Sequence, residues 1–434
     1  MRRALPALTF ALAALAGAGQ AVTVTPAPGE GRPLGGLLLG GPGFNLGNWM
    51  PVVEALPELR ALRPALLRWP GGNIGDENDL TRAALQTLKT NWTLLGEPDL
   101  IVQTRVFTRG GVGRAAPEDA AQAVRDAREL GLRVAYWEIG NEPDLYATNR
   151  SDPGWTPAKY CATVRSQRAA ILAADPQARI AGAATSNPGA FLDEVLRGCA
   201  DAFDLVTYHL YPTDGGATDD AALASIERVT GSVAHLRELW ADPQRNPTAQ
   251  GQPLNLAVTE FALSWRTDRA RHLSDALGGL WATEATLRFL EAGVRPAYFA
   301  LMGVGNHGLL DDATFPRFGY GALREAAQLR GQNFPVTGDD PRVWLHAATD
   351  GDRLTLLALN TGAATLPLTP QLDGWQLIGA KTVTPAGVDA DRFPTALNLT
   401  LPLTLAPQSV TRVVFRRAPC PPPLPSPTCT GVLP

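Results

Sequence analysis

The 434-residue sequence has no excess of basic charge, because its 38 Lys and Arg residues are outnumbered by 42 Asp and Glu residues. Binding to the phosphate backbone of nucleic acids requires clustered cations, so no nucleic-acid partner is expected. Charged residues are also few, at 18%, whereas 45% of the residues are hydrophobic. This composition excludes a disordered chain and predicts one large folded domain with a small second one.

Cysteine is scarce, and none of the four cysteines has the spacing of a zinc site. A Gly-x-Gly-x-x-Gly fingerprint for a nucleotide is also absent. We therefore expect neither a metal nor another cofactor. Cys161 and Cys199 lie on separate predicted helices, where pairing is open, and Cys420 and Cys429 flank a proline-rich run and are expected to close a loop.

Long apolar runs are missing after the N-terminus. Arg2 and Arg3 precede an apolar stretch to about residue 18, and Gly19-Gln20-Ala21 places small residues at a cleavage site. Residues 1–21 are thus predicted to be a signal peptide. We expect a secreted or periplasmic protein that has no membrane association after the signal is removed.

Strands and helices alternate over residues 35–331, which predicts a parallel sheet of the α/β class. The strand candidates are continuous apolar runs, as expected when both faces of a sheet are covered. Eight units favour a closed (β/α)8 TIM barrel, with strands at Gly36–Gly40, Ala65–Trp69, Leu100–Phe107, Arg133–Asn141, Arg179–Ala184, Asp204–Tyr211, Asn255–Glu260 and Ala297–Gly303.

Helix boundaries are marked between these runs. Ala116-Pro117-Glu118-Asp119 begins one helix and Gly131 ends it. Thr156-Pro157 begins another, which is predicted to run to about Asp175. The stretches Asp219–Trp240 and Asp268–Gly293 are predicted to be amphipathic helices.

Beyond about residue 332 the helical pattern stops. Arg342–Ala347 and Arg353–Asn360 are joined by a turn at Asp350-Gly351-Asp352, which predicts a hairpin. Residues 332–417 are therefore predicted to form a small antiparallel β-sandwich, to which residues 22–34 could add a strand. Residues 418–434 form a proline-rich tail.

Two glutamates, Glu142 and Glu260, each end an apolar strand, and they belong to the fourth and seventh of the eight predicted strands. Catalytic groups of (β/α)8 barrels lie at the carboxyl ends of the strands, so we expect the two to face each other. A carboxylate pair is the equipment needed to cleave a glycosidic bond. Each alone could equally be a cap or surface acid.

Residues two apart on a strand share a face, which predicts the orientation of both glutamates. Tyr136, Glu138 and Glu142 are expected to point towards the barrel axis, as is Glu260 together with Leu256 and Val258. Glu138 lies deeper and is expected to pair with a buried arginine, because an unpaired interior carboxylate is costly.

Other strand ends carry polar or aromatic groups. Arg68 can hold a carboxylate by two hydrogen bonds, and Asn73 follows the Pro-Gly-Gly turn after it. His209 and Tyr211 share a face at the end of the sixth strand, where Tyr211 could orient a carboxylate. Trp265 could stack on a sugar, although a lone tryptophan more often packs in a core. Asn306 and His307 are weaker candidates.

These residues resemble those of a known family. Trp137-Glu138-Ile139-Gly140-Asn141-Glu142-Pro143 is similar to the acid/base motif of clan A glycoside hydrolases, which are retaining (β/α)8 enzymes. The Arg68–Asn73 segment and His209-Leu210-Tyr211 resemble those of α-L-arabinofuranosidases, whereas Asn141–Tyr146 resembles β-glucuronidases of the heparanase type. Many members carry a tryptophan after strand eight, where this sequence has Tyr298–Met302.

The resemblance implies that Glu142 is the acid/base and Glu260 the nucleophile. By the same resemblance, Asn141 binds the sugar 2-hydroxyl and Asn73 touches the glycone. Arg68 and Tyr211 support and orient Glu260. The implied function is a secreted retaining glycosidase acting on an oligo- or polysaccharide. The alternatives are a β-glucuronidase or another clan A glycosidase, and a non-catalytic carbohydrate-binding barrel.

Overall fold

The computed structural model describes residues 21–27, 41–109, 113–249, 251–388 and 401–418. Four predictions fall wholly or almost wholly outside these ranges: the signal peptide, the strand Gly36–Gly40, the Cys420–Cys429 loop and the proline-rich tail.

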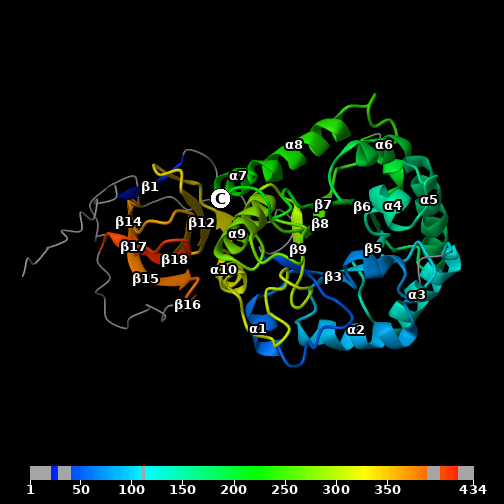
Figure 1. The fold of residues 1–434 in the computed structure, drawn as a ribbon, viewed down its shortest axis with the longest axis horizontal. Coiled ribbons are helices and arrows are strands. Elements are labelled where there is room, and N and C mark those ends of the chain that lie inside the picture. The colour runs from blue at the N-terminus through cyan, green and yellow to red at the C-terminus, as the bar shows by residue number, and fades with distance from the viewer. Residues whose placement is uncertain (1–20, 28–40, 110–112, 250, 389–400, 419–434) are drawn as a thin grey trace, which may run out of the picture.

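Eight parallel strands close into a barrel in chain order, and they occupy the right half of Figure 1. They are β2 (Gly43–Asn45), β3 (Leu66–Trp69), β4 (Asp99–Thr104), β5 (Tyr136–Ile139), β6 (Ile180–Thr185), β7 (Leu205–Leu210), β8 (Leu256–Phe261) and β9 (Arg295–Tyr298). The first barrel strand is thus β2 rather than the predicted Gly36–Gly40. With three residues, β2 is too short to show a periodic pattern in the sequence.

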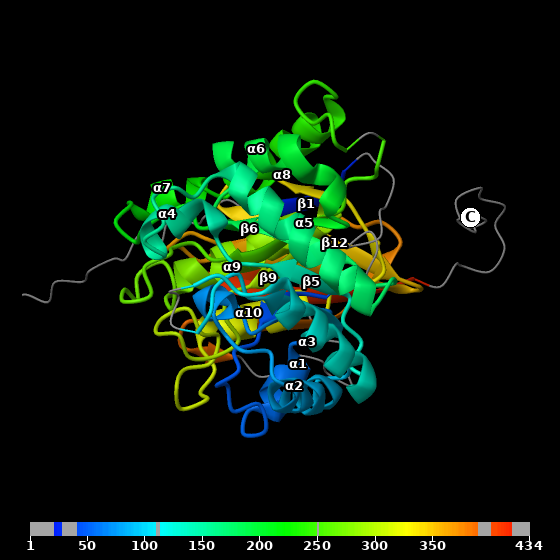
Figure 2. The same ribbon diagram turned by 90° about the vertical axis from the view of Figure 1, so that its right-hand side faces the viewer.

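One main helix follows each strand, and Figure 2 views the barrel from the side covered by α2, α3, α5 and α6. These helices are α1 (Leu56–Ala61), α2 (Arg82–Leu94), α3 (Pro117–Leu130), α5 (Pro157–Ala174), α6 (Ala190–Cys199), α8 (Glu227–Ala241), α9 (Ala276–Glu291) and α10 (Phe318–Ala326). Short turns add α4 (Tyr146–Asn149), α7 (Asp219–Ala224), η1 (Gly72–Asp76), η2 (Pro143–Leu145) and η3 (Ala200–Ala202).

The predicted ends of α3 and α5 are confirmed. Pro117 occupies the first turn of α3, and Gly131 ends that helix in the left-handed conformation at φ 68°. The Thr156 hydroxyl accepts a hydrogen bond from the Lys159 amide at 3.3 Å and so caps α5, which stops at Asp175.

Two helix predictions need correction. The stretch Asp219–Trp240 divides into α7 and α8 around Ser225, whose hydroxyl donates to the Ala222 carbonyl and competes with the helical pattern. The stretch Asp268–Gly293 becomes helical only at Ala276, and the resulting α9 is buried on nearly every side rather than amphipathic. The C-terminal sheets cover the face of α9 that would otherwise meet water.

The barrel interior changes from apolar to polar along the strands. Its lower layer consists of apolar side chains, namely Leu66, Ile101, Tyr136, Ala181, Leu205, Ala257 and Ala297. Two residues further along β3 and β5, the same inward face carries Arg68 and Glu138, both fully buried. The carboxyl ends of the strands therefore hold a buried polar layer beneath the barrel mouth.

Two sheets pack face to face beside the barrel, on the left of Figure 1. The four-stranded sheet runs β11 (Val336–Gly338), β1 (Val22–Pro26), β14 (Leu366–Pro370) and β17 (Leu403–Leu405). The six-stranded sheet runs β10 (Gln332–Asn333), β12 (Val343–Asp350), β13 (Arg353–Asn360), β18 (Ser409–Arg417), β15 (Trp375–Thr384) and β16 (Gly387–Val388). All pairs are antiparallel except β1 with β14. The N-terminal segment thus joins the sandwich.

The outer face of the six-stranded sheet packs against α9 and α10. Leu357 and Val410 of the sheet share an apolar cluster with Leu280 and Leu287 of α9 and Ala322 of α10. A disulfide between Cys161 and Cys199 joins α5 to α6. Within the described residues, no helix is both long and apolar enough to span a lipid bilayer.

Candidate active site

Arg68 is the centre of the buried polar layer at the barrel mouth. Its side chain is fully buried, and its Nε donates to Glu138 Oε2 at 2.5 Å. Its Nη1 donates to Glu260 Oε1 at 2.6 Å and its Nη2 to Asn141 Oδ1 at 2.8 Å. The predicted pairing of Glu138 with a buried arginine is therefore confirmed, and a single guanidinium connects β3, β5 and β8.

Glu260 is surrounded by hydrogen-bond donors. Besides Arg68, the Gly72 amide donates to Oε1 at 3.0 Å and the Tyr211 hydroxyl donates to Oε2 at 2.9 Å. The His209 ring nitrogen Nδ1 lies 3.6 Å from the same Oε2. Burial alone would raise the pKa of Glu260, but the charges of His209 and Arg68 and the hydrogen bonds outweigh it and lower the pKa.

Glu142 lies opposite in a more open setting. Its side chain is 15% exposed, against 5% for Glu260, and its Oε1 lies 3.0 Å from His209 Nδ1. One oxygen of each carboxylate and His209 Nδ1 all lie within 4.8 Å of one another. Burial lowers the pKa of His209, yet the charge of Glu260 and the hydrogen bond to Glu142 raise it overall.

A cavity of about 790 Å³ opens above the two glutamates. Its lining includes five residues singled out from the sequence besides the glutamates: Asn73, Asn141, Tyr211, Trp265 and His307. Asn141 Nδ2 donates to Asn73 Oδ1 at 3.1 Å, and Trp265 is 54% exposed at the rim. Phe299 lines the cavity after β9. Asn306 bonds to Ser274 and the Thr267 carbonyl instead and is not among the lining residues.

The orientation predicted along β8 is wrong in one respect. Leu256 and Val258 pack outward into the core shared with the helices, whereas Ala257 belongs to the interior layer. The β7–β8 register skips Thr259, so that Tyr208 pairs with Val258 and His209 with Glu260. This β-bulge shifts the alternation by one residue and turns Glu260 inward.

Several groups at the site carry no clear signal in the sequence. Asn45 of β2 accepts from Arg68 Nη1 at 3.1 Å and donates to the Thr259 carbonyl at 2.8 Å. Asp76, at the end of η1, is fully buried and accepts from the Asn141 amide. Burial raises the pKa of Asp76 to about 7, against the opposing hydrogen bond from Tyr146. In the sequence both residues look like ordinary loop polar groups.

Among the described residues, one group of acids and histidines could hold a metal ion: Glu142, His209 and Glu260. Glu142 and Glu260 line the cavity, and His209 is buried next to both carboxylates. The Arg68 guanidinium, bonded to Glu260, opposes a second cation there.

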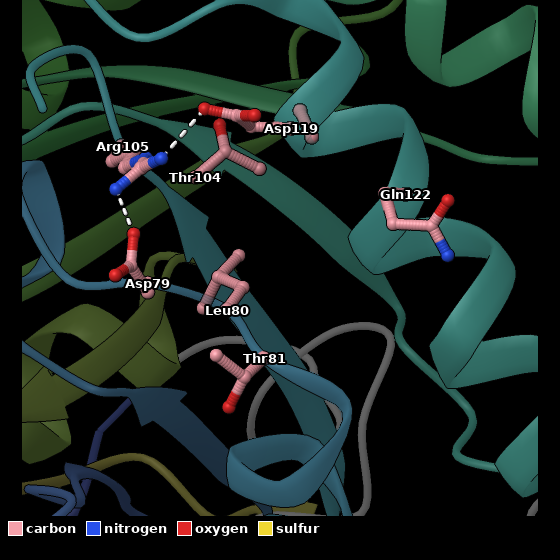
Figure 3. Close-up of a pocket in the computed structure, with 8 residues that line it drawn as sticks. Asp79, Leu80, Thr81, Thr104, Arg105, Asp119 and Gln122 are labelled. Atoms are coloured by element: carbon pink, nitrogen blue, oxygen red, sulfur yellow. Dashed lines mark hydrogen bonds and ion pairs between the residues drawn. The ribbon is translucent and has the colours of Figure 1, made fainter.

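A second, smaller cavity of about 190 Å³ lies between β4 and the start of α3 (Figure 3). Its two acids, Asp79 and Asp119, both bond to Arg105. Both carboxylates are paired with the same guanidinium. The described residues that line this cavity therefore offer no unpaired carboxylate for catalysis.

No family model matches the sequence, and no curated protein is similar to it in sequence. Solved structures are similar in fold. The α-L-arabinofuranosidase of Thermotoga maritima has a TM-score of 0.68 at 15% identity, covering 91% of this chain and 99% of that one.

A family 51 α-L-arabinofuranosidase from Bifidobacterium longum has a TM-score of 0.69 at 17% identity, covering 91% of this chain and 99% of that one. A monomeric β-xylosidase from Caulobacter crescentus has a TM-score of 0.62 at 16% identity, covering 88% and 98%. The chain therefore has the barrel-and-sandwich fold of these glycoside hydrolases, in agreement with the resemblance of its strand-end motifs to clan A.

Proposed function

We propose that the protein is a retaining glycoside hydrolase in which Glu260 is the nucleophile and Glu142 the general acid/base. The observation that carries the proposal is the approach of the two carboxylates within 4.8 Å in one cavity, in different surroundings. Retaining enzymes hold their carboxyl groups about 5–5.5 Å apart, whereas inverting enzymes need about 6.5–9.5 Å to admit a water molecule.

In the first step, an ionised Glu260 oxygen attacks the anomeric carbon while Glu142 gives its proton to the departing glycosidic oxygen. The donors around Glu260 keep it ionised, and Tyr211 orients it for attack. In the second step, Glu142 takes a proton from water, whose oxygen displaces Glu260 from the sugar. His209 lies between the two carboxylates and links their charge states.

The remaining groups hold the sugar. Asn141 and Asn73, joined by a hydrogen bond, offer amide groups to sugar hydroxyls. Trp265 presents an exposed ring at the rim, where the apolar face of a sugar can stack. Phe299 follows the last barrel strand, in the region where related enzymes carry a tryptophan.

We propose a neutral pentoside, of the α-L-arabinofuranoside kind, as the first substrate class. Solved structures of similar fold are named as arabinofuranosidases and a β-xylosidase. Asn73 and Asn141 supply neutral hydrogen-bonding groups next to the nucleophile.

One observation favours a β-glucuronide as the second candidate. Arg228 of α8 is the single lysine or arginine among the described residues that line the cavity. It is exposed, and its Nη1 donates to the Pro212 carbonyl at 3.0 Å, which leaves other donors for a sugar carboxylate. The substitution Arg228→Gln should lower kcat/KM on a glucuronide and leave an arabinofuranoside unaffected.

We also propose that the protein is exported. The first 21 residues have the composition of a signal peptide, and disulfides such as Cys161–Cys199 persist in oxidising compartments. Fractionation of cells that express the full chain would test this, and retention of the protein in the cytosol would contradict it.

The chemistry is tested by azide rescue of two variants. Glu260→Gly removes the nucleophile, so azide in its place should give a glycosyl azide of inverted configuration. Glu142→Ala removes acid assistance but leaves the glycosyl-enzyme intermediate, so azide should give the retained product from a dinitrophenyl glycoside.

The anomeric configuration of each azide product is read by NMR. Exchange of the two outcomes would reverse the assigned roles. A wild-type protein that binds oligosaccharides but cleaves no aryl arabinofuranoside, xyloside or glucuronide would instead support the non-catalytic carbohydrate-binding alternative.

A further inference from the structure

The turn that presents Glu142 has an unusual backbone and needs support. Gly140 and Glu142 both have positive φ values, 79° and 50°, and a non-glycine residue in this region is uncommon and strained. Three amides anchor the turn: Gly140 to the Thr104 carbonyl at 3.1 Å, Asn141 to Asp76 at 2.8 Å and Glu142 to the Ala184 carbonyl at 2.8 Å. Among these three, only the central anchor is made by side chains, since the Asn141 amide also lies 3.0 Å from the Tyr146 hydroxyl.

The Asp76 side chain is held firmly in place. Asp76 Oδ1, which accepts the Asn141 amide, also accepts the Tyr146 hydroxyl at 2.5 Å. Its Oδ2 lies 3.4 Å from Arg150 Nη2. The space is tight, because a Cβ placed on Gly140 would lie 2.6 Å from the Tyr146 oxygen. The Asp76 side chain is thus held in one position against Asn141, the residue that precedes Glu142.

Asp76 also connects the strand end that carries Glu142 with the loop that contacts Glu260. Asp76 ends the short η1 helix, which begins at Gly72, whose amide donates to Glu260. Arg150, which approaches Asp76, also donates to the Asn73 carbonyl at 3.0 Å. A shift of Asp76 would therefore move the strand end that carries Glu142 relative to the loop that contacts Glu260.

We propose that Asp76 is a positioning residue for the general acid/base: by holding the Asn141 amide, its carboxylate sets where the Glu142 side chain meets the leaving group. This inference rests on the proposed function and names a residue to which the motifs assign no role. Asp76 does not line the cavity, and it reaches Glu142 through the backbone amide of Asn141.

A positioning role predicts a dependence on the leaving group. Proton transfer requires hydrogen-bond reach between the acid and the departing oxygen, and a displacement of about 1 Å can cost about 10²-fold in rate. A dinitrophenolate departs without a proton, so a displaced Glu142 leaves its release almost unaffected. A residue that merely stabilised the fold would affect both kinds of substrate equally.

The test compares kcat/KM on a dinitrophenyl glycoside and on an alkyl glycoside of the same sugar. Asp76→Ala should lower the alkyl value by about 10²-fold and the dinitrophenyl value by less than about threefold. Asp76→Asn keeps an oxygen that accepts the Asn141 amide and should restore most of the loss. Tyr146→Phe removes the other donor to Oδ1 and the second acceptor near the Asn141 amide but keeps the Asp76 carboxylate. It should lower the alkyl value more than the dinitrophenyl value, by a smaller factor than Asp76→Ala.

The matched control is Tyr208→Phe, because Tyr208 is equally buried and its hydroxyl bonds to Ser232 outside the barrel. In Tyr208→Phe, the ratio of kcat/KM on the alkyl glycoside to kcat/KM on the dinitrophenyl glycoside should equal that of the wild type. Equal losses on both substrates in Asp76→Ala would overturn the proposal. If Asp76→Ala does not fold, the contrast between Tyr146→Phe and Tyr208→Phe decides. An inactive wild type contradicts the glycosidase function itself, a result distinct from an unchanged leaving-group ratio.

Discussion

Glu142 and Glu260 are the same residue type, and their neighbours separate their chemistry. Glu260 accepts from Arg68, the Gly72 amide and Tyr211, all of which favour the ionised carboxylate. Glu142 has the His209 ring as its side-chain partner and faces the cavity. In the proposed mechanism, the acid that releases a proton thus lies where a leaving group arrives, and the acid that attacks lies where its charge is stabilised.

The substitution Tyr211→Phe tests this division. In the wild type, the hydrogen bond from Tyr211 favours the ionised form of Glu260. The substitution removes this bond and should therefore raise the pKa of Glu260. The acidic limb of kcat/KM should move up by about one pH unit, because a hydrogen bond to a charged group contributes about 1.5–3 kcal/mol and one pH unit corresponds to about 1.4 kcal/mol. Tyr208→Phe, whose hydroxyl lies outside the barrel, should not move the limb. An unchanged limb in Tyr211→Phe would show that this hydrogen bond does not tune Glu260.

The turn between β3 and η1 brings the backbone close to Glu260, the proposed nucleophile. Gly71 and Gly72 have φ values of 75° and 66°, which L-residues rarely adopt. This conformation aims the Gly72 amide at Glu260. A Cβ on Gly71 would lie 2.8 Å from Asn45 Oδ1, the atom that accepts from Arg68. The two glycines therefore allow the positive φ values of the turn, and the missing Cβ of Gly71 leaves room for Asn45 in the polar layer.

We expect Gly71→Ala to impair stability and activity together. At Gly71 the backbone has φ 75° and ψ 144°, a region that costs on the order of 1–3 kcal/mol with a Cβ. The displaced Asn45 should also disturb Arg68 and lower kcat/KM by tenfold or more, on the order of 1.4 kcal/mol. Gly96→Ala is the matched control, since Gly96 has φ 88° and no atom within 4 Å of an added Cβ. It should lose comparable stability in urea unfolding with unchanged activity. Equal activity in the two variants would contradict the packing argument.

The barrel and the sandwich are joined through buried ion pairs. His346 of β12 lies between two glutamates of α9, with Nε2 2.8 Å from Glu284 and Nδ1 2.7 Å from Glu291. Burial lowers the pKa of His346, but the charges of the two glutamates outweigh it and raise the pKa to about 10. Nearby, Arg412 of β18 donates to Glu325 of α10 at 2.7 Å. Charge pairing therefore supplements the apolar contact between the two bodies.

His346→Leu should lower the free energy of unfolding by about 1.5–3 kcal/mol at pH 6, because it removes hydrogen bonds from a charged group to both glutamates. Glu284 keeps its ion pair with Arg288 at 2.7 Å, and the Glu291 side chain is 28% exposed, so neither carboxylate is left buried without compensation. The folded-state pKa is raised, so the stabilisation is complete below the unfolded value of about 6.5 and is lost as the pH rises towards 10. Urea unfolding at pH 6 and pH 9.5 measures this loss as a shrinking difference between variant and wild type. The partly exposed pair of His235 with Asp193 provides the control, and His235→Leu should change stability by about 0–1 kcal/mol. A difference that grew with pH would contradict the assignment.

Local patterns in the sequence were sufficient for the fold class and for most of the strands and helices. Parallel strands covered on both faces are continuous apolar runs, and helix caps such as Thr156 and Gly131 act within a few residues. The motif around Glu142 and the glutamate ending the seventh predicted strand could be recognised for the same reason. The carboxyl ends of the strands meet at one mouth in any closed parallel barrel. The sequence could therefore also predict that Glu142 and Glu260 lie close together.

Features that depend on distant contacts were beyond the sequence. The bulge at Thr259 reverses the side-chain alternation of β8, because consecutive residues of β7 pair with Val258 and Glu260 on either side of it. No residue type in β8 predicts this bulge. The nearly complete burial of α9 results from sheets that follow it in the chain. Asp76 looks like a surface acid until folding places it under Asn141, 65 residues away. Residue types and their local spacing therefore specified the barrel and its two glutamates, whereas the groups that tune and position those glutamates depend on closure of the barrel, which alone brings such distant segments together.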